Sequence, residues 1–233
     1  MPRRVLVTGA SRGIGAALVE RFLAAGDQVF GCGRTAAEGA VSKNYTHYTA
    51  DVSDEHAVRD MFGDIRRRAG GLDVLVNNAG IARMNLLALT PPSDARQVVE
   101  TNILGVFNCS HQAVRLMRRS PAGRIVNLTT VAVPLRLEGE AIYAASKAAV
   151  ESLTRVTARE LGPMGITCNA VGPTPIRTDL IAKVPAAKLE TLVARQAIPE
   201  WATFDDVYNV VEFFVRPDSR MITGQVIYLG GIS

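Results

Sequence analysis

Arg4-Val-Leu-Val-Thr-Gly-Ala-Ser-Arg-Gly-Ile-Gly15 joins a short aliphatic run to a glycine-rich turn, and a helical pattern follows as far as Gly26. This order predicts a strand over residues 4–8, a turn and a helix. Glycines let the backbone approach a ligand closely, and a helix N-terminus offers free N–H groups to a phosphate. A tight turn that needs glycine only for its geometry explains the residues too, because the spacing differs from GxGxxG.

Apolar runs and helical patterns alternate along the rest of the chain. Further strands are expected at residues 29–32, 46–49, 72–76, 123–130, 166–171 and 226–229, with a helix in each crossover. Crossovers of helix length imply parallel strands with helices on both faces of the sheet. We therefore expect one α/β domain over residues 1–233, a doubly wound Rossmann-type parallel sheet of about seven strands.

Several helix ends can be predicted from capping residues. Ser53 is expected to cap a helix with acidic residues in its first turn, and Ser93 a long helix that contains Asn102. Asparagine is a mediocre helix residue, so a specific reason for Asn102 is plausible. Thr203 and Asp206 form a predicted capping box.

Composition argues against nucleic acid and metal as partners. The net charge is +4, yet the basic residues are dispersed and aromatic residues make up only 6%, so runs such as Arg3-Arg4 are interpreted as mostly solvated helix faces. The three cysteines (Cys32, Cys109, Cys168) and three histidines (His47, His56, His111) show no ligand spacing. Because no stretch suits a signal peptide or a membrane span, we expect a cytoplasmic protein.

Tyr143-Ala-Ala-Ser-Lys147 carries the clearest chemical signal. Its phenol and ammonium lie four positions apart in a helical pattern that ends at Gly162-Pro163, so they share a helix face. A nearby lysine charge favours the phenolate and lowers the tyrosine pKa, which would let the pair exchange a proton with a substrate oxygen. Many solvated helices carry the same pair by chance.

Other polar and glycine residues follow the predicted strands, where ligands of such folds bind. They are Asp51, Asn77 to Gly80, Thr130 and residues 172–178. The second strand ends at Gly33-Arg34 without an adjacent carboxylate, and Arg12 lies in the glycine loop. Arginine accommodates the extra phosphate of NADP, whereas an acidic residue there would bind the ribose of NAD. The cofactor expected is NADP(H), although both arginines could simply be solvated.

Prolines at 173, 175, 185 and 199 interrupt the chain between the sixth strand and the last predicted helix. A long interrupted excursion of this kind often covers a site, so residues 179–203 are predicted to form a substrate lid. A disordered surface loop is the alternative.

Taken in order, the motifs resemble those of the short-chain dehydrogenase/reductase family over essentially the whole chain. They are Thr8-Gly-Ala-Ser-Arg-Gly-Ile-Gly15, Asn77-Asn-Ala-Gly80, Asn102, Tyr143-Ala-Ala-Ser-Lys147 and Thr223-Gly-Gln225 to Gly230-Gly231. Within the family, the segments from Gly80 to Leu87 and from Glu100 to Asn102 look most like NADPH-dependent 3-oxoacyl-(acyl carrier protein) reductases.

The resemblance implies roles for single residues. Tyr143 would be the general acid, Lys147 would lower its pKa and bind the nicotinamide ribose, and Asn102 would hold a water of a proton relay. The implied cofactor contacts are Gly9, Ser11, Arg12, Gly13, Ile14, Gly15, Arg34, Asp51, Val52, Asn77, Ala79, Gly80, Tyr143, Lys147, Pro173, Ile176 and Thr178.

Two positions depart from the family pattern. Thr130 stands where the family has a catalytic serine, and its hydroxyl can donate the same hydrogen bond while its methyl crowds the pocket. Thr174 replaces a usual glycine, which would place a side chain near the nicotinamide. Both departures leave the substrate open.

The resemblance implies an NADPH-dependent reductase of a 3-oxoacyl thioester or similar 3-oxo compound, small or carrier-bound. Oxidation of a sugar, polyol or secondary-metabolite alcohol is the alternative within the same chemistry, and a weakly catalytic cofactor-binding scaffold or sensor is a third. A homotetramer or dimer is also implied, through long helices in which Ala145, Ala148 and Ala149 permit close packing. Packing of that helix on the sheet would explain these alanines equally well.

Overall fold

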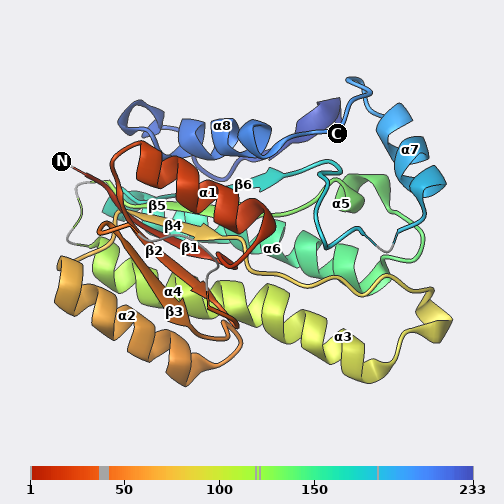
Figure 1. The fold of residues 1–233 in the computed structure, drawn as a ribbon. Coiled ribbons are helices and arrows are strands. Elements are labelled where there is room, and N and C mark those ends of the chain that lie inside the picture. The colour runs from red at the N-terminus through yellow and green to blue at the C-terminus, as the bar shows by residue number, and fades with distance from the viewer. Residues whose placement is uncertain (1, 37–41, 119, 121, 183, 233) are drawn as a thin grey trace.

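Seven parallel strands form one sheet in the order β3-β2-β1-β4-β5-β6-β7 in the computed structural model, which describes residues 2–36, 42–118, 120, 122–182 and 184–232 (Figure 1). The strands are β1 (Arg4–Thr8), β2 (Gln28–Gly33), β3 (Tyr45–Thr49), β4 (Val74–Asn77), β5 (Arg124–Leu128), β6 (Thr167–Gly172) and β7 (Val226–Tyr228). The chain winds outward from β1 to β3, returns to β4 and continues to β7. The predicted doubly wound α/β sheet is confirmed, with its switch point between β1 and β4.

Helices cover both faces of the sheet (Figure 1). Helices α1 (Gly13–Ala24) and α8 (Phe204–Val215) lie on one face, and α2 (Glu55–Ala69), α4 (Gly105–Met117) and α6 (Ala141–Leu161) on the other. The remaining helices are α3 (Pro92–Val99), α5 (Ala132–Leu135), α7 (Ala186–Ala194), the π-helical segment η2 (Glu100–Leu104) and the 3-10 turns η1 (Leu87–Leu89), η3 (Gly162–Met164), η4 (Pro217–Ser219) and η5 (Leu229–Gly231).

Each face of the sheet has its own hydrophobic core, and successive side chains of a strand pack alternately into one core and the other. Val5 and Val7 of β1 join the cluster under α1 and α8, whereas Leu6 joins the cluster under α2, α4 and α6. Phe22 of α1 and Phe62 of α2 are essentially inaccessible on opposite faces. Because burial of each such side chain contributes about 1.5–3 kcal/mol, a continuous apolar strand is stable only with both layers present.

Two predicted helix ends agree with the structure. Helix α6 ends at Leu161, directly before Gly162-Pro163. Thr203 caps α8, since its Oγ1 accepts from the Asp206 amide at 3.3 Å while its own amide donates to the Asp206 carboxylate at 2.7 Å. Both sequence signals are local, which explains why they could be recognised without tertiary information.

Two predicted caps are wrong. Asp54, not Ser53, caps α2 by accepting from the amides of His56 and Ala57, while Ser53 instead donates to Asp51. Helix α3 begins at Pro92 rather than after Ser93. Proline suits the first turn because its φ is already helical and its missing N–H would have no helical partner.

The connections also differ from strict alternation. Between β2 and β3 the described residues, 34–36 and 42–44, contain no helix, and residues 37–41 lie outside the described part of the chain. The long helix predicted around Asn102 is three segments, because the π-helical turn η2 separates α3 from α4. Single π-turns of this kind often occur at functional sites.

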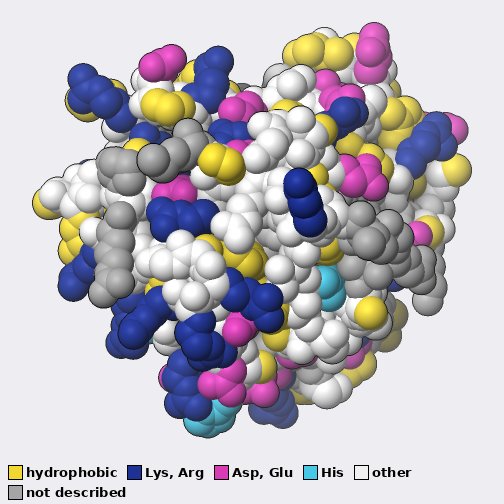
Figure 2. Space-filling model, turned by 60° about the vertical axis from the view of Figure 1, so that its left-hand side comes forward, with side chains coloured by type: hydrophobic (Ala, Val, Ile, Leu, Met, Phe, Trp, Pro, Cys, Tyr) yellow, Lys and Arg dark blue, Asp and Glu magenta, His cyan; other side chains and the backbone are white. Residues whose placement is uncertain are grey.

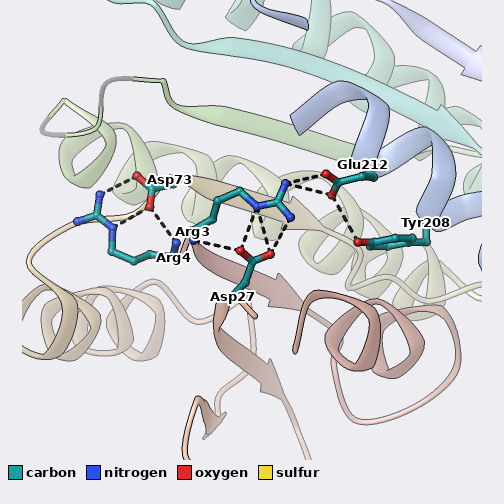
Figure 3. Close-up of polar contacts among 6 residues, drawn as sticks. All are labelled: Arg3, Arg4, Asp27, Asp73, Tyr208 and Glu212. Carbon is teal, nitrogen blue, oxygen red and sulfur yellow. Dashed lines mark hydrogen bonds and ion pairs between the residues drawn. The ribbon is translucent and has the colours of Figure 1, made fainter. Parts of the chain in front are cut away.

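The two arginines interpreted as solvated are ion-paired at the start of β1 (Figure 3). Arg3 bonds to Asp27 at 2.7 Å and to Glu212 of α8 at 2.9 Å, and Arg4 bonds to Asp73 at 2.6 Å. Burial opposes the charge of Arg3, but its bonds to both carboxylates raise its pKa overall. The interpretation as a solvated run is therefore wrong here. The pairs fasten β1 to the turn before β2, to the start of β4 and to α8.

Other cations do lie on a solvated helix face. Figure 2 shows Lys and Arg side chains gathered at its lower left, with acidic side chains among them. On α2, Arg67 and Arg68 pair with Asp64 at 2.9 and 2.5 Å. The bonds from Arg68, Tyr48 and Arg67, in that order, lower the pKa of Asp64 to about 2. None of the helices in the described ranges combines the length and hydropathy that a membrane crossing requires.

Candidate functional site

The carboxyl ends of the central strands bring the predicted site residues together. The glycine loop follows β1, Asn77 to Gly80 end β4, Thr130 follows β5, and residues 173–178 follow β6. Helix α6 adds Tyr143 and Lys147 from beneath the sheet. The site therefore lies at the topological switch point, where parallel α/β sheets bind ligands.

Glycines shape the loop between β1 and α1. Gly9 and Gly13 have φ of +67° and +57°, in the left-handed region that favours glycine. A Cβ on Gly15 would lie 2.1 Å from the Gly9 carbonyl oxygen, so close packing of helix and turn requires glycine. Tight geometry and ligand approach thus both depend on these residues.

The N-terminus of α1 is suited to an anion. Among the described residues no side chain caps it and no acidic residue lies in its first turn. Helix α2 has Asp54 and Glu55 at the same place, and α8 has Asp205 and Asp206. Because carboxylates would repel a phosphate there, the contrast favours phosphate binding at α1.

Asn78 holds the glycine loop through the neighbouring strand β1, as an asparagine in a turn after a strand can do. Its Nδ2 donates to the carbonyl oxygens of Thr8 and Gly9 at 2.9 and 3.2 Å. The Thr8 hydroxyl accepts in return from the amides of Asn78 and Ala79 at 3.0 and 2.9 Å. The motif that contains Asn78 was recognised, but not its partner across the sheet.

Two predicted cofactor residues have side chains that point inward. Asn77 is 2% exposed and donates to Asn127 at 2.9 Å and to Ser110 at 3.0 Å. Val52 packs so closely on α4 that a Cβ at Gly105 would lie 2.5 Å from its methyl group. Any ligand contact by Asn77 or Val52 thus falls to the main chain.

Asn102 holds the loop after β4 in place. In η2 its side chain is completely buried, its Oδ1 accepts from the Ile81 amide at 2.9 Å, and its Nδ2 donates to the Ile81 carbonyl at 2.9 Å and to Ser146 at 3.0 Å. It thereby links η2 to the loop and to the face of α6 that carries Tyr143 and Lys147. The specific reason expected for asparagine at this position is this pairing.

Lys147 lies beneath an open glycine. Its Nζ donates to the Leu128 carbonyl at 2.8 Å, and burial lowers its pKa to about 8. A Cβ on the exposed Gly80 would lie 3.3 Å from this Nζ and 3.4 Å from Asn102 Oδ1. Glycine thus leaves space directly above the ammonium and the amide.

Tyr143 is buried, and its pKa is raised, not lowered. Burial is the main cause and the charge of Glu140 the second, while hydrogen bonding with Thr130 lowers the pKa. The expected net lowering of the Tyr143 pKa is therefore not found, and the Lys147 Nζ donates to the Leu128 carbonyl. Sequence reasoning missed Glu140, whose own pKa burial raises to about 7.

The described residues contain no group of three His, Cys, Asp or Glu side chains that could hold a metal ion.

Sequence comparison agrees with this arrangement. The family described as enoyl-(acyl carrier protein) reductase matches residues 9–232. The 3-oxoacyl-[acyl-carrier-protein] reductase FabG of Staphylococcus aureus is 36% identical over 240 residues, which cover 99% of this chain and 98% of that protein. The corresponding protein of Salmonella typhimurium is 33% identical, covering 97% and 95%. This chain belongs to the short-chain dehydrogenase/reductase family.

Solved structures show the same fold. The aldohexose dehydrogenase AldT of Thermoplasma acidophilum, in ligand-free form, superposes with a TM-score of 0.90 at 29% identity, covering 99% of this chain and 94% of its own. ElxO with NADP bound superposes with a TM-score of 0.90 at 30% identity, covering 99% and 98%. As a short-chain dehydrogenase/reductase, the chain is an oxidoreductase.

The two arginines expected at the cofactor phosphate of this dehydrogenase/reductase are at the surface. Arg12 pairs with Asp179 at 3.2 Å, and both side chains are exposed. Such a pair is weak, so a stronger anion can displace the carboxylate. Arg34 is exposed at the end of β2.

The departure at Thr174 from the family pattern has a structural explanation. Thr174 is 5% exposed, and its hydroxyl donates to Gln196 at 2.6 Å, where Gln196 follows α7 in the predicted lid. The Thr174 hydroxyl is therefore directed to the segment that was predicted to form a lid. Ile176 is buried, and the nearest atom to a Cβ at Gly13 would be the Thr178 methyl at 3.7 Å. Pro173 accepts from the Val131 amide at 3.3 Å, next to Thr130.

Proposed function

We propose that this protein is an NADPH-dependent carbonyl reductase that acts on a 3-oxoacyl thioester or a related 3-oxo compound. The observation that carries the proposal is the meeting of Tyr143, Lys147 and Asn102 beside the glycine loop. The relatives named 3-oxoacyl-[acyl-carrier-protein] reductase, at 33–36% identity over nearly the full chain, support the substrate class. The NADP complex of ElxO supports the cofactor.

The described residues fit NADPH. The backbone from Gly13 to Gly15 and the α1 N-terminus suit its diphosphate, and Arg12 and Arg34 suit the 2′-phosphate. Asp51 has one carboxylate oxygen bonded to Ser53 and lies at the end of β3, on the adenine side of such folds. The opening above Gly80 leaves room for the nicotinamide ribose over Lys147.

When bound, NADPH supplies the hydride for the substrate carbonyl carbon. Tyr143 donates its phenolic proton to the carbonyl oxygen, so that the ketone becomes an alcohol and the phenol becomes phenolate. Its raised pKa keeps Tyr143 protonated at neutral pH, as a general acid requires. The Thr130 hydroxyl orients the same oxygen by hydrogen bonding.

Lys147 and Asn102 support this proton transfer. With a pKa of about 8, Lys147 is mostly charged at neutral pH and stabilises the phenolate as it forms. The side-chain amide of Asn102 bonds to Ile81 and Ser146, so it fixes the loop after β4 and the start of α6, which form the floor of the site beside Lys147. A water of the implied proton relay would be held at this floor.

Oxidation of a sugar or other alcohol is the second candidate. The similarity to an aldohexose dehydrogenase favours it, and the same residues would run the reaction in reverse, with Tyr143 as the base. A panel of 3-oxoacyl thioesters and aldoses separates the two candidates by turnover.

We further infer a cytoplasmic homo-oligomer. Leu104 of η2, Phe107 of α4 and Val156 of α6 are about half exposed. Ala145 and Ala148 are exposed too, so sheet packing does not explain these two alanines. An apolar surface of this kind is suited to a second copy of the chain. Sedimentation of the wild type against a Phe107→Glu variant tests this assembly.

The decisive experiment compares wild type with Tyr143→Phe, using Tyr48→Phe on α2's side of the sheet as a matched control. Tyr143→Phe is expected to abolish NADPH-dependent reduction of a 3-oxoacyl thioester while NADPH still quenches or shifts the fluorescence of Trp201. The control is expected to keep both. Full turnover by Tyr143→Phe would remove the phenol from the mechanism, and an NADH preference in wild type would refute the cofactor assignment.

A further inference from the structure

The carbonyl oxygen of Thr35, directly after Arg34, accepts hydrogen bonds from two other segments. Ser11 Oγ of the glycine loop donates to it at 2.9 Å, and His47 Nε2 of β3 lies 2.9 Å from it. Ser11 adjoins Arg12. The two arginines that suit a 2′-phosphate are therefore each next to a residue of this hydrogen-bonded group.

The contacts define the state of the His47 ring. A carbonyl oxygen can only accept, so Nε2 carries the proton, and Nδ1 is left to accept from the Tyr45 hydroxyl at 2.8 Å. Burial raises the pKa of Tyr45 to about 12, which keeps its hydroxyl protonated as the donor. Tyr45, His47 and Thr35 thus form one directed chain of hydrogen bonds.

Gly31 makes room for this chain. A Cβ there would lie 2.3 Å from the Tyr45 hydroxyl and 2.9 Å from the Ala10 methyl carbon. Glycine weakens the interior of a strand, so its place in the middle of β2 needs a reason. Glycine is needed at position 31 because any side chain there would occupy the space of the Tyr45 hydroxyl.

We propose that His47 is a positioning residue for cofactor choice: through the Thr35 carbonyl it holds the end of β2 so that Arg34 faces the 2′-phosphate of NADPH. This inference rests on the proposed NADPH dependence and adds a residue that acts on it without touching the cofactor. Arg34 is exposed on a loop, and a fixed backbone reduces the entropy lost when the side chain binds phosphate. NADH lacks that phosphate, so its binding gains nothing from the arrangement.

The test measures binding of NADPH and of NADH by fluorescence titration for wild type, His47→Leu and His47→Gln. Loss of one hydrogen bond that orders the loop is expected to weaken NADPH binding about three- to tenfold and NADH binding less than about twofold. Glutamine can still donate to the Thr35 carbonyl, so His47→Gln is expected to recover most of the NADPH affinity. His56→Leu, an exposed histidine of α2, is the matched control and is expected to match wild type.

Tyr45→Phe guards against a folding defect in the leucine variant, since it removes only the donor to Nδ1 and keeps the ring. It is expected to shift the NADPH-to-NADH ratio in the same direction by a smaller factor. Equal weakening of both cofactors by His47→Leu, or no weakening, overturns the role of His47 while wild-type NADPH preference still supports the proposed function. Absence of NADPH preference in wild type overturns both.

Discussion

Replacement of Glu140 by glutamine removes a charge that the fold holds next to Tyr143, the proposed general acid. Glu140 lies one turn before Tyr143, at the N-cap position of α6, and burial raises its pKa to about 7. Its negative charge raises the pKa of Tyr143 in turn. Two consequences follow, one for stability and one for the rate.

The stability effect has a definite sign. The carboxyl pKa is raised from 4.5 to about 7 on folding, so between these pH values the folded state binds more protons than the unfolded state. The fold is most stable with Glu140 protonated. This stability is fully present below pH 4.5 and is lost as the pH rises through about 7. A pKa shift is worth about 1.4 kcal/mol per unit, and solvent screens part of it because the side chain is half-buried. Wild type is therefore expected to lose about 2 kcal/mol of unfolding free energy as the pH rises through this window, and Glu140→Gln is not.

Urea unfolding at about pH 4.5, 6 and 8 measures this difference, with the exposed Glu138→Gln as the matched control. The free energy of unfolding of Glu140→Gln minus that of wild type is expected to rise with pH, and the control difference to stay flat. In turnover, Glu140→Gln is expected to retain more activity than wild type above about pH 7, because ionised Glu140 no longer opposes the phenolate. Parallel stability curves for wild type and Glu140→Gln over the whole range would refute this reasoning.

Two further substitutions probe the site. Gly80→Ala adds a methyl 3.3 Å from Lys147 Nζ, and we expect kcat/KM to fall about tenfold or more. Gly162→Ala, where the added methyl meets open space, is the control and is expected to behave as wild type. Unchanged turnover in Gly80→Ala would show that the space above Lys147 is not used. Thr174→Val leaves the buried Gln196 without its hydrogen-bond donor, so we expect a loss of about 1–3 kcal/mol in stability and a higher KM for the carbonyl substrate. An unchanged Tm and KM would show that this hydrogen bond does not hold the segment from 179 to 203 in place.

Much of the fold could be predicted from the chain because its signals are local. Apolar runs of strand length, glycines that need positive φ, and the capping box at Thr203 depend on neighbouring residues only. Tyr143 and Lys147 share a helix face wherever that helix packs, and the parallel sheet then brings its strand ends to one edge. The sequence by itself therefore determined the architecture and the choice of Tyr143 and Lys147 as the proposed reacting groups.

The tertiary structure alone decided how those groups are surrounded. Burial, which depends on residues distant in sequence, raises the pKa of Tyr143, lowers that of Lys147 and makes Glu140 part of the site. Long-range pairing likewise made Arg3, an expected surface cation, a partner of Asp27, and it made Thr174, an expected neighbour of the nicotinamide, a hydrogen-bond donor to Gln196. Desolvation and hydrogen-bond partners are properties of the packed chain, and no local pattern of residues encodes them.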